Sequence, residues 1–225
     1  MIEFDNAGFS YGTREIFSGV SMELATGGFY FLTGPSGAGK TTFLRLCYLD
    51  LMPSQVAMSV LGKVTGTISR DAVADLRRRI GVVHQDCQFL DHLNVADNIA
   101  LPLRITGKEA VSHAGEIEDL LHWVGLEHRA DAHPAELSGG ERQRAALARA
   151  VIMSPDLIIA DEPTGNIDWD MGQKVMTLLI ELNKLGKTII VASHDMTMIR
   201  ATGAAVSARV LRLKGGQLLQ AGADL

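Results

Sequence analysis

Short, mostly apolar runs alternate with longer segments of helical periodicity through much of the chain. Four of these runs have the length of buried strands: Phe29–Thr33, Ile80–His84, Leu157–Ala160 and Thr188–Ala192. Apolar residues at helical spacing predict helices over Phe43–Cys47, Asp71–Arg79, Gly140–Met153 and Asp168–Leu185. Strands that alternate with helices predict an α/β fold with a mostly parallel sheet, covered on both faces.

Segments near the two ends of the chain show a different pattern. Ile2–Tyr11 and Ile16–Leu24 alternate partly between apolar and polar residues around a Gly-Thr pair, which predicts antiparallel strands at an edge. Val60–Ile68 is rich in glycine and β-branched residues, and we expect it to add to the same sheet. Val210–Leu213 and Gln217–Gln220 flank two glycines and predict a hairpin.

The middle of the chain has no continuous strand pattern. Between Cys87 and about His133, helical spacing appears over Val95–Leu101 and Ala110–Val124. The breaks in this pattern fall at Pro102, Gly107 and Gly125. This composition predicts an inserted helical lobe rather than a separate domain.

Length and composition limit the possible classes of protein. The 225 residues, 47% hydrophobic and 21% charged, can bury a sizeable core in one domain. A net charge of −5 argues against a nucleic-acid-binding face, which is usually basic. Cys47 and Cys87 lack the spacing of a metal site or a disulfide, which favours a reducing compartment. We see no secretion signal and no apolar run near the roughly 18 residues of a membrane span, so attachment to a membrane would depend on a partner.

Residues Gly34–Thr42 match the phosphate-binding pattern G-x-x-x-x-G-K-[ST] between a predicted strand and a predicted helix. The glycines let the backbone turn tightly and aim its N–H groups at an anion beside a helix N-terminus. We expect Lys40 to reach the β- and γ-phosphates of a nucleoside triphosphate and the Thr41 hydroxyl to bind Mg²⁺. The predicted phosphate-binding residues are Gly34, Pro35, Ser36, Gly37, Ala38, Gly39, Lys40, Thr41 and Thr42.

Two carboxylates, Asp161 and Glu162, follow the apolar strand Leu157–Ala160. A carboxylate at such a strand end can hold Mg²⁺ through water, which suits Asp161. One residue further on, Glu162 would polarise a water that attacks the γ-phosphate. An acidic pair after a strand can also be an ordinary turn, and the phosphate-binding loop is what favours the catalytic interpretation.

Leu137–Gln143 contains a second possible anion-binding element. Ser138 can cap the following helix, and Gly139 and Gly140 leave backbone N–H groups open at its positive end. Taken alone, this pattern is that of a plain helix cap. Because one chain needs only one γ-phosphate cradle, a second cradle makes sense if it faces the nucleotide of another subunit.

The run Leu-Ser-Gly-Gly-Glu resembles the signature motif of ATP-binding-cassette (ABC) ATPases, and further motifs stand in the order of that family. Tyr11 corresponds to the aromatic residue that stacks on adenine, Gln85 to the Q-loop and His194 to the switch histidine. Gly165–Asp168 occupies the place of the D-loop. Tyr11 or His194 alone would be an ordinary core or surface residue, so the joint order carries the resemblance, which extends from about Ile2 to Gly222.

The resemblance implies a P-loop NTPase (RecA-like) core with a mostly parallel sheet, an antiparallel β edge subdomain and an inserted α-helical subdomain. Residues 1–225 would form one nucleotide-binding domain, with the core and β subdomain at about 1–86 and 134–225 and the helical subdomain at about 87–133. It also implies ATP hydrolysis to ADP and phosphate, with ATP and Mg²⁺ as cofactors.

In this family the ATP-bound form is a head-to-tail homodimer, which implies roles for residues on both sides of each nucleotide. ATP would lie between Gly34–Thr42 of one subunit and the partner's signature motif. The implied residues on the signature side are Ser138, Gly139, Gly140, Glu141 and, in the D-loop, Asp168. Glu162 would be the catalytic base, and His194 would contact the γ-phosphate. The implied metal-site residues are Thr41, Gln85 and Asp161, with Gln85 also sensing the attacking water.

The residues of three short segments narrow the resemblance to one branch of the family. Phe31–Gly34, Pro163–Asp168 and Leu90–Leu103 resemble the branch that holds the cell-division (FtsE), lipoprotein-release and MacB-type efflux ATPases. The entry to the phosphate-binding loop favours the cell-division type. That type implies the integral membrane partner FtsX, other division proteins, a peripheral place on the cytoplasmic side of the inner membrane, and signalling to cell-wall hydrolases. Met52–Leu61 and His84 differ from the residues that are usual in this branch.

Other interpretations remain at this stage. Phe89, Leu90, Leu93 and Val95 are more apolar than an exposed loop needs, and they either form a groove for a partner helix or pack the lobe itself. DNA-repair cassettes carry long coiled coils or zinc-binding cysteines, and ribosome-associated cassettes usually carry two phosphate-binding loops. A P-loop kinase would leave Leu137–Gln143 unexplained. We therefore expect an ATPase of a membrane complex that does not bind nucleic acid.

Overall fold

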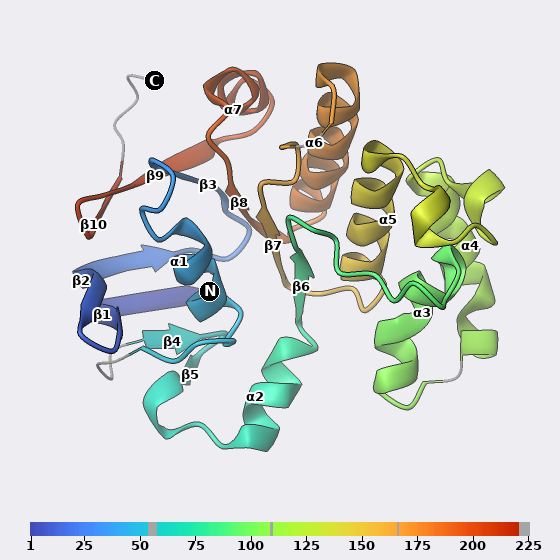
Figure 1. Cartoon of the computed structure of the whole chain (residues 1–225). Coiled ribbons are helices and arrows are strands. Elements are labelled where there is room, and N and C mark those ends of the chain that lie inside the picture. Colours follow the sequence, from blue (N-terminus) through green and yellow to red (C-terminus); the bar gives the residue numbers. More distant parts are fainter. Residues whose placement is uncertain (54–57, 109, 166, 221–225) are drawn as a thin grey trace.

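A six-stranded sheet runs through the centre of the computed structural model, which describes residues 1–53, 58–108, 110–165 and 167–220 (Figure 1). Its strands lie in the order β10-β9-β3-β8-β7-β6. They are β3 (Phe29–Thr33), β6 (Ile80–Val83), β7 (Leu157–Asp161), β8 (Thr188–Ala192), β9 (Ala208–Lys214) and β10 (Gln217–Gln220). All neighbours are parallel except β9 and β10, which form the predicted hairpin. The α/β fold with a mostly parallel sheet is confirmed.

A second, antiparallel sheet has the order β2-β1-β4-β5 and contains the predicted edge strands. Its strands are β1 (Ile2–Tyr11), β2 (Arg14–Leu24), β4 (Met58–Val60) and β5 (Lys63–Val64). The expected contribution of Val60–Ile68 is only partly right, because the 3₁₀ turn η1 (Thr65–Thr67) follows β5. The Ser18 N–H donates to the Gly216 carbonyl over 3.2 Å and joins this sheet to the β9–β10 turn.

Helices surround the central sheet and occupy most of the positions that the apolar pattern predicts (Figure 1). The α-helices are α1 (Lys40–Cys47), α2 (Arg70–Arg77), α3 (Val95–Ile105), α4 (Ala114–Trp123), α5 (Gly139–Val151), α6 (Trp169–Lys184) and α7 (Met196–Gly203). Further 3₁₀ turns are η2 (Ala110–His113), η3 (Glu127–Arg129) and η4 (Pro134–Glu136). The pattern over Ala110–Val124 therefore forms two elements, η2 and α4, instead of one helix.

Two features of the helices differ from the prediction. Helix α3 continues through Pro102, where the sequence predicts a break, because Ile99, Ala100 and Leu103 anchor it in the core on either side. Helix α7 was not predicted. The Asp195 side chain begins it by accepting hydrogen bonds from the N–H groups of Thr197 and Met198.

Alternate residues of each central strand enter two different hydrophobic cores. Phe29 and Phe31 of β3 pack with α5 and α6 on one face, whereas Tyr30 and Leu32 pack with α1 and the antiparallel sheet on the other. Residues of β7 and β8 alternate in the same way. A strand buried on both faces has no polar side, which explains why these segments appear in the sequence as continuous apolar runs.

In the described part of residues 87–133, every regular element is a helix or a 3₁₀ turn. Asn98 is fully buried there. Its Oδ1 accepts a hydrogen bond from the Leu90 N–H, and its Nδ2 donates to the carbonyls of Leu90, Leu93 and Asn94. These bonds hold the segment before α3 against the helix. The division of the chain into a core and a helical subdomain stays a prediction.

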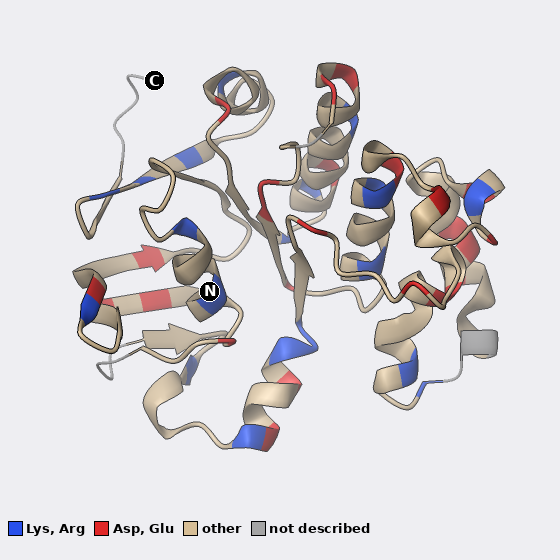
Figure 2. Ribbon diagram, viewed as in Figure 1, with Lys and Arg blue, Asp and Glu red and all other residues tan. Residues whose placement is uncertain are grey.

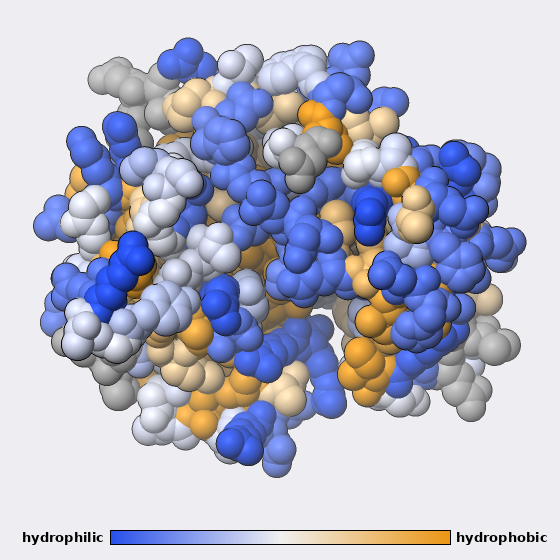
Figure 3. Space-filling model, in the orientation of Figure 1, coloured by the Kyte–Doolittle hydropathy of each residue, from blue (hydrophilic) through white to orange (hydrophobic). Residues whose placement is uncertain are grey.

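The surface carries both signs of charge, and Figure 2 shows acidic and basic residues interspersed over the ribbon. In Figure 3 a hollow opens between α2 and α3, and apolar residues gather on its α3 side. This groove holds about 490 Å³, and Leu101, Pro102 and Ile105 of α3 are among the residues that line it. Over the ranges that the structure describes, no helix is long and apolar enough to cross a bilayer.

Candidate active site

The loop between β3 and α1 has a backbone that only glycine tolerates at two positions. Gly34 has φ 153°, and a Cβ atom there would lie 2.4 Å from the Leu213 carbonyl oxygen. Gly39 has φ 101°, and a Cβ atom there would lie 2.5 Å from Cγ2 of Ile16. Close approach of neighbouring strands therefore selects these glycines, and the result is a tight loop that ends at the N-terminus of α1.

Lys40, the first residue of α1, folds back over this loop. Its Nζ donates to the Gly34 carbonyl over 3.0 Å and to the Pro35 carbonyl over 3.4 Å. The same Nζ lies 3.9 Å from Oε1 of Glu162, and both side chains are only 12% exposed. The charge of Lys40 is thus concentrated where a phosphate group would enter the loop.

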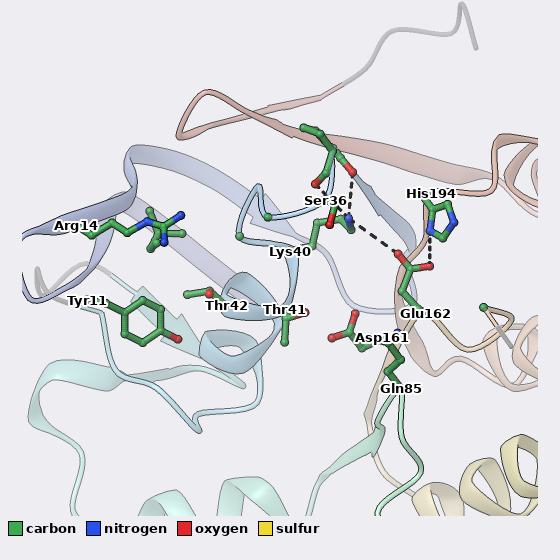
Figure 4. Close-up of a pocket in the computed structure, with 16 residues that line it drawn as sticks. Tyr11, Arg14, Ser36, Lys40, Thr41, Thr42, Gln85, Asp161, Glu162 and His194 are labelled. Atoms are coloured by element: carbon green, nitrogen blue, oxygen red, sulfur yellow. Dashed lines mark hydrogen bonds and ion pairs between the residues drawn. The ribbon is translucent and has the colours of Figure 1, made fainter.

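A pocket of about 690 Å³ opens above the loop and brings together residues from five parts of the chain (Figure 4). The predicted residues that line it are Tyr11, Gly34, Pro35, Ser36, Gly37, Gly39, Lys40, Thr41, Thr42, Gln85, Asp161, Glu162 and His194. Arg14, Ile16 and Gly165 line it as well. Ala38 is not a lining residue, because its side chain packs against the core beneath.

Glu162 lies between two basic groups at the end of β7. Its Oε2 is 3.0 Å from Nδ1 of His194, and its Oε1 faces Lys40 (Figure 4). The backbone of Glu162 has φ 48°, an uncommon value for a residue with a side chain. A hydrogen bond from the Glu162 N–H to the Ala192 carbonyl, 2.9 Å, holds this conformation. Such strain is found mostly at functional sites, where the surrounding structure maintains it.

The chemistry of Asp161 and Thr41 fits a magnesium ion. Burial raises the pKa of the Asp161 carboxyl, and a hydrogen bond from Thr41 opposes that rise. A half-buried carboxylate of this kind gains from a cation beside it. The described residues hold no group of three or more His, Cys, Asp or Glu that could bind a metal alone. Mg²⁺ commonly takes one or two protein oxygens and completes its shell with phosphates and water, which suits this donor set.

Gln85, Tyr11 and Arg14 complete the walls of the pocket. Gln85 follows β6 and reaches toward Asp161, whereas Tyr11 and Arg14 lie across α1 from Glu162 (Figure 4). Tyr11 is 44% exposed, as a residue that stacks on a flat ligand must be. Arg45 donates to the Tyr11 hydroxyl over 3.4 Å and is itself held by Asp50 at 2.6 Å. The sequence analysis did not predict that Arg14, the first residue of β2, lines this pocket.

The second predicted anion-binding element does not line this pocket. Ser138 caps α5, and Glu141 bonds back to the Ser138 N–H over 2.8 Å while Arg129 holds its other oxygen at 3.0 Å. Gly139 and Gly140 form the first turn of that helix. Asp168 caps α6 through the Met171 N–H. Asn166, within the motif compared to the D-loop, lies outside the described residues, as do residues 54–57 and the C-terminal 221–225.

The family model described as ABC transporter matches residues 17–165, which contain the phosphate-binding loop, Ser138–Glu141 and Glu162. The chain belongs to the ABC transporter family. This ABC chain is therefore an ATP-binding subunit that hydrolyses ATP.

Comparison with known proteins places this ABC chain beside cell-division ATPases. It is 36% identical to the cell division ATP-binding protein FtsE of Bacillus subtilis over 203 residues, 90% of this chain and 87% of the relative. It is 42% identical to the methionine import ATP-binding protein MetN 2 of Burkholderia mallei over 183 residues, 81% of this chain but 46% of the relative.

A solved structure resembles nearly the whole of this ABC chain. It is the dimeric post-hydrolysis state of the ATP-binding cassette MJ0796, bound to ADP and Pi. The TM-score is 0.87 at 30% sequence identity, with 98% of each chain covered. At this level of similarity the ABC cassette fold is established for the chain described here.

Proposed function

We propose that this ABC ATPase binds Mg-ATP in the pocket of Gly34–Thr42 and hydrolyses it with Glu162 as the catalytic base. The observation that supports the proposal most is the convergence of Lys40, Glu162 and His194 in one pocket, from three separate segments. Lys40 and His194 both lie beside Glu162, so the group that would activate water and the groups that would contact the γ-phosphate lie together.

The residues divide the chemistry among them. The N–H groups of the loop and Lys40 would bind the phosphates, so that Lys40 exchanges its bonds to two carbonyls for bonds to phosphate oxygens. Tyr11 would stack on the adenine. Glu162 would take a proton from the attacking water, and His194, which already holds the Glu162 carboxylate, would contact the γ-phosphate. Thr41, Asp161 and Gln85 would hold Mg²⁺, which when bound neutralises charge between the β- and γ-phosphates.

A second subunit would complete each site. Ser138–Glu141 presents an N-terminal helix turn with two glycines, yet it lies outside the pocket of its own chain. The similar cassette MJ0796 is dimeric with ADP and Pi. A head-to-tail homodimer would bring Ser138–Glu141, and Asp168 beside it, onto the nucleotide of the other subunit. Hydrolysis would then require closure of two chains, which couples it to motion.

The groove between α2 and α3 is the surface we propose for a helix of an integral membrane partner. Its walls combine apolar Leu101, Pro102 and Ile105 with polar Arg78 and Gln88, and Ile105 is 74% exposed. The apolar residues expected from the sequence behave differently. Val95 is buried in the core, and Phe89, Leu90 and Leu93 are not among the residues that line the groove.

Similarity to FtsE over most of both chains favours a role in cell division. We propose that the partner is FtsX-like, that other division proteins join the complex, and that this chain is peripheral on the cytoplasmic side of the inner membrane. ATP-driven closure would then signal through the partner to peptidoglycan hydrolases. A methionine importer is the second candidate, because of the 42% identity to MetN 2. Lipoprotein release and MacB-type efflux are further outcomes of the test.

The Glu162→Gln variant tests mechanism and partner together. The amide cannot accept the proton of the attacking water, so we expect kcat for ATP hydrolysis to fall by about 100-fold while ATP affinity is kept. The variant should accumulate as an ATP-bound dimer in size-exclusion chromatography. Hydrolysis at the wild-type rate would remove Glu162 from the role of base.

The same variant, loaded with Mg-ATP, serves to capture partners from solubilised native membranes for mass spectrometry. Recovery of one FtsX-like membrane protein with division proteins supports the proposed role, and recovery of a methionine, lipoprotein or efflux permease replaces it. Adding Ile105→Glu should abolish capture while thermal stability is unchanged, because a charge would enter the groove. Capture that survives Ile105→Glu would contradict the groove as the docking surface.

A further inference from the structure

The loop that follows β6 carries unusual backbone geometry between the active site and the groove. Cys87 has φ 60° and Gln88 has φ 46°, so two consecutive residues with side chains adopt left-handed conformations. Each such residue costs roughly 1–2 kcal/mol of conformational energy unless other contacts hold it. The Cys87 N–H donates to the His84 carbonyl over 3.0 Å and the Gln88 N–H to the Asp86 carbonyl over 2.8 Å, and a contact from outside the loop would stabilise this geometry further.

Arg149, in the last turn of α5, supplies such a contact. Its Nη1 donates to the Gln88 carbonyl over 2.9 Å, and its Nη2 donates to the Cys87 carbonyl. The guanidinium also lies 4.7 Å from the centre of the Phe89 ring. One side chain thus binds three successive residues of the strained loop.

The charged guanidinium of Arg149 is largely buried, and burial disfavours its charge. Burial lowers the pKa of Arg149, and the contacts described for its guanidinium are backbone carbonyls and an aromatic ring. Bonds from a charged donor to buried carbonyls are stronger than neutral ones, and a planar fork can serve both carbonyls at once. A lysine would keep the charge but lose the fork.

The loop connects two cavities. Gln85 lines the active-site pocket, whereas Gln88 and Arg149 line the groove between α2 and α3. Helix α5 also contacts the start of the loop, because Nε2 of Gln143 lies 3.4 Å from the Gln85 carbonyl. Helix α5 therefore contacts both ends of the segment that holds Gln85.

We propose that Arg149 is a positioning residue for ATP hydrolysis: it locks the 85–89 loop so that Gln85 stays in the active site. The inference rests on the proposed role of Gln85 at the metal and the attacking water. The new element is that Arg149 restrains the loop.

Hydrogen exchange tests the restraint directly. In Arg149→Lys, amides of residues 84–90 should exchange at least about tenfold faster, because the fork to two carbonyls is lost. Arg144→Lys is the matched control. Arg144 is on the same helix and donates to the carbonyls of Val124 and Gly125, so its substitution should speed exchange over 122–127 instead. Unchanged exchange over 84–90 in Arg149→Lys, or an equal increase there in Arg144→Lys, would overturn the restraint.

A double-mutant cycle tests the link to hydrolysis. We expect Arg149→Lys to lower kcat about tenfold with the affinity for ATP within twofold of wild type, and to add little to the loss in Gln85→Ala. A double variant whose loss of kcat equals the product of the two single losses would mean that Arg149 acts by another route, and it would overturn the proposal. If Gln85→Ala alone leaves kcat unchanged, the proposed role of Gln85 fails and the link to hydrolysis fails with it.

A second variant covers the case in which Arg149→Lys does not fold. Phe89→Leu removes the ring that faces the guanidinium and leaves both carbonyl bonds. We expect faster exchange over 84–90 and a lower kcat, both smaller than in Arg149→Lys. Wild-type values for both quantities would again overturn the proposal.

Discussion

Asp161 carries a charge that the fold disfavours in the absence of ligands. Burial raises the pKa of its carboxyl above the ordinary value of 3.8, so at neutral pH the ionised side chain destabilises the folded chain relative to the unfolded one. The cost is present in full above the raised pKa and disappears as pH falls below 3.8. A residue kept despite such a cost is typical of a functional site.

Replacing Asp161 with Asn should therefore separate stability from activity. The amide retains an acceptor for Thr41 but removes the buried charge, so we expect Tm of the nucleotide-free chain at pH 7 to rise by roughly 2–4 °C. The difference should shrink as pH is lowered toward 4 in a series of thermal melts. ATP hydrolysis with Mg²⁺ should fall by about 100-fold or more. Asp119→Asn, at an exposed site on α4, is the control, and a lower Tm in Asp161→Asn would contradict the argument.

At the scale of residues, sequence predicted the lining of the pocket wherever a motif dictates local geometry. Gly34 and Gly39 are required by neighbouring atoms, and the loop pattern contains them both. Arg14 could not be found in the same way, because it is the first residue of β2 and a lone arginine at a strand end has no diagnostic spacing. The Glu162–His194 contact joins two segments that are 32 residues apart, and only the fold brings them together.

At the scale of elements, α5 begins with a reciprocal cap. The Glu141 N–H donates to Ser138 Oγ, and the Ser138 N–H donates to the Glu141 carboxylate. The Ser138 backbone and hydroxyl bonds and the neighbouring Arg129 lower the pKa of Glu141. The resulting stability is therefore present above the ordinary value of 4.5 and is lost as pH falls through the depressed pKa of the folded state.

The variant Glu141→Gln should show this dependence. At pH 7 we expect Tm to fall by roughly 1–3 °C, because the ion pair with Arg129 and the negative charge at the helix N-terminus are lost. The difference in Tm from wild type should decrease progressively when thermal melts are repeated below pH 4.5. Glu118→Gln, which removes an exposed carboxylate from α4, provides the comparison. A gap that is constant from pH 7 to acid would show that the charge of Glu141 does not contribute.

Elements with a strong apolar pattern were predictable, and the others depended on tertiary context. The strands β3, β7 and β8 are buried on both faces, so each forms a continuous apolar run. Helix α7 has only eight residues, half of them apolar, and its clearest sign was the cap at Asp195. The parallel pairing of β9 with β3 was beyond reach, because the register Phe29–Ala208 joins strands far apart in the chain.

At the scale of the whole molecule, the sequence contains two predicted anion-binding elements, and only residues of Gly34–Thr42 line the pocket of their own chain. Ser138–Glu141 begins α5, whereas the pocket is formed by loops at the ends of β3, β6, β7 and β8 and by the β1–β2 turn. Within one chain, Ser138 and Glu141 serve as the cap of α5. The proposed head-to-tail dimer would give this segment a second role, since each site would then take one element from each subunit.

That arrangement predicts complementation between two inactive variants. Lys40→Ala destroys the phosphate-binding loop of its own chain, and Ser138→Arg blocks the cradle that the chain offers to its partner. In a mixture of the two, half of the dimers pair different variants, and each of these has one intact site. We therefore expect recovery of about a quarter of wild-type hydrolysis per chain, provided that one site suffices for turnover. The measurement is steady-state phosphate release from each variant alone and from the equimolar mixture.

Lys40→Ala mixed with Glu162→Gln is the matched control for this complementation. Both lesions affect the same pocket of their own chain, so every dimer of the mixture has two defective sites and no activity should return. Thermal melts should first establish that Ser138→Arg is folded, since the lost cap costs roughly 1 kcal/mol. Recovery in the first mixture but not in the second requires that Lys40 and Ser138 act on one nucleotide from different chains. Failure of the first mixture, with all variants folded and able to dimerise, would contradict a head-to-tail dimer in which one intact site suffices for turnover.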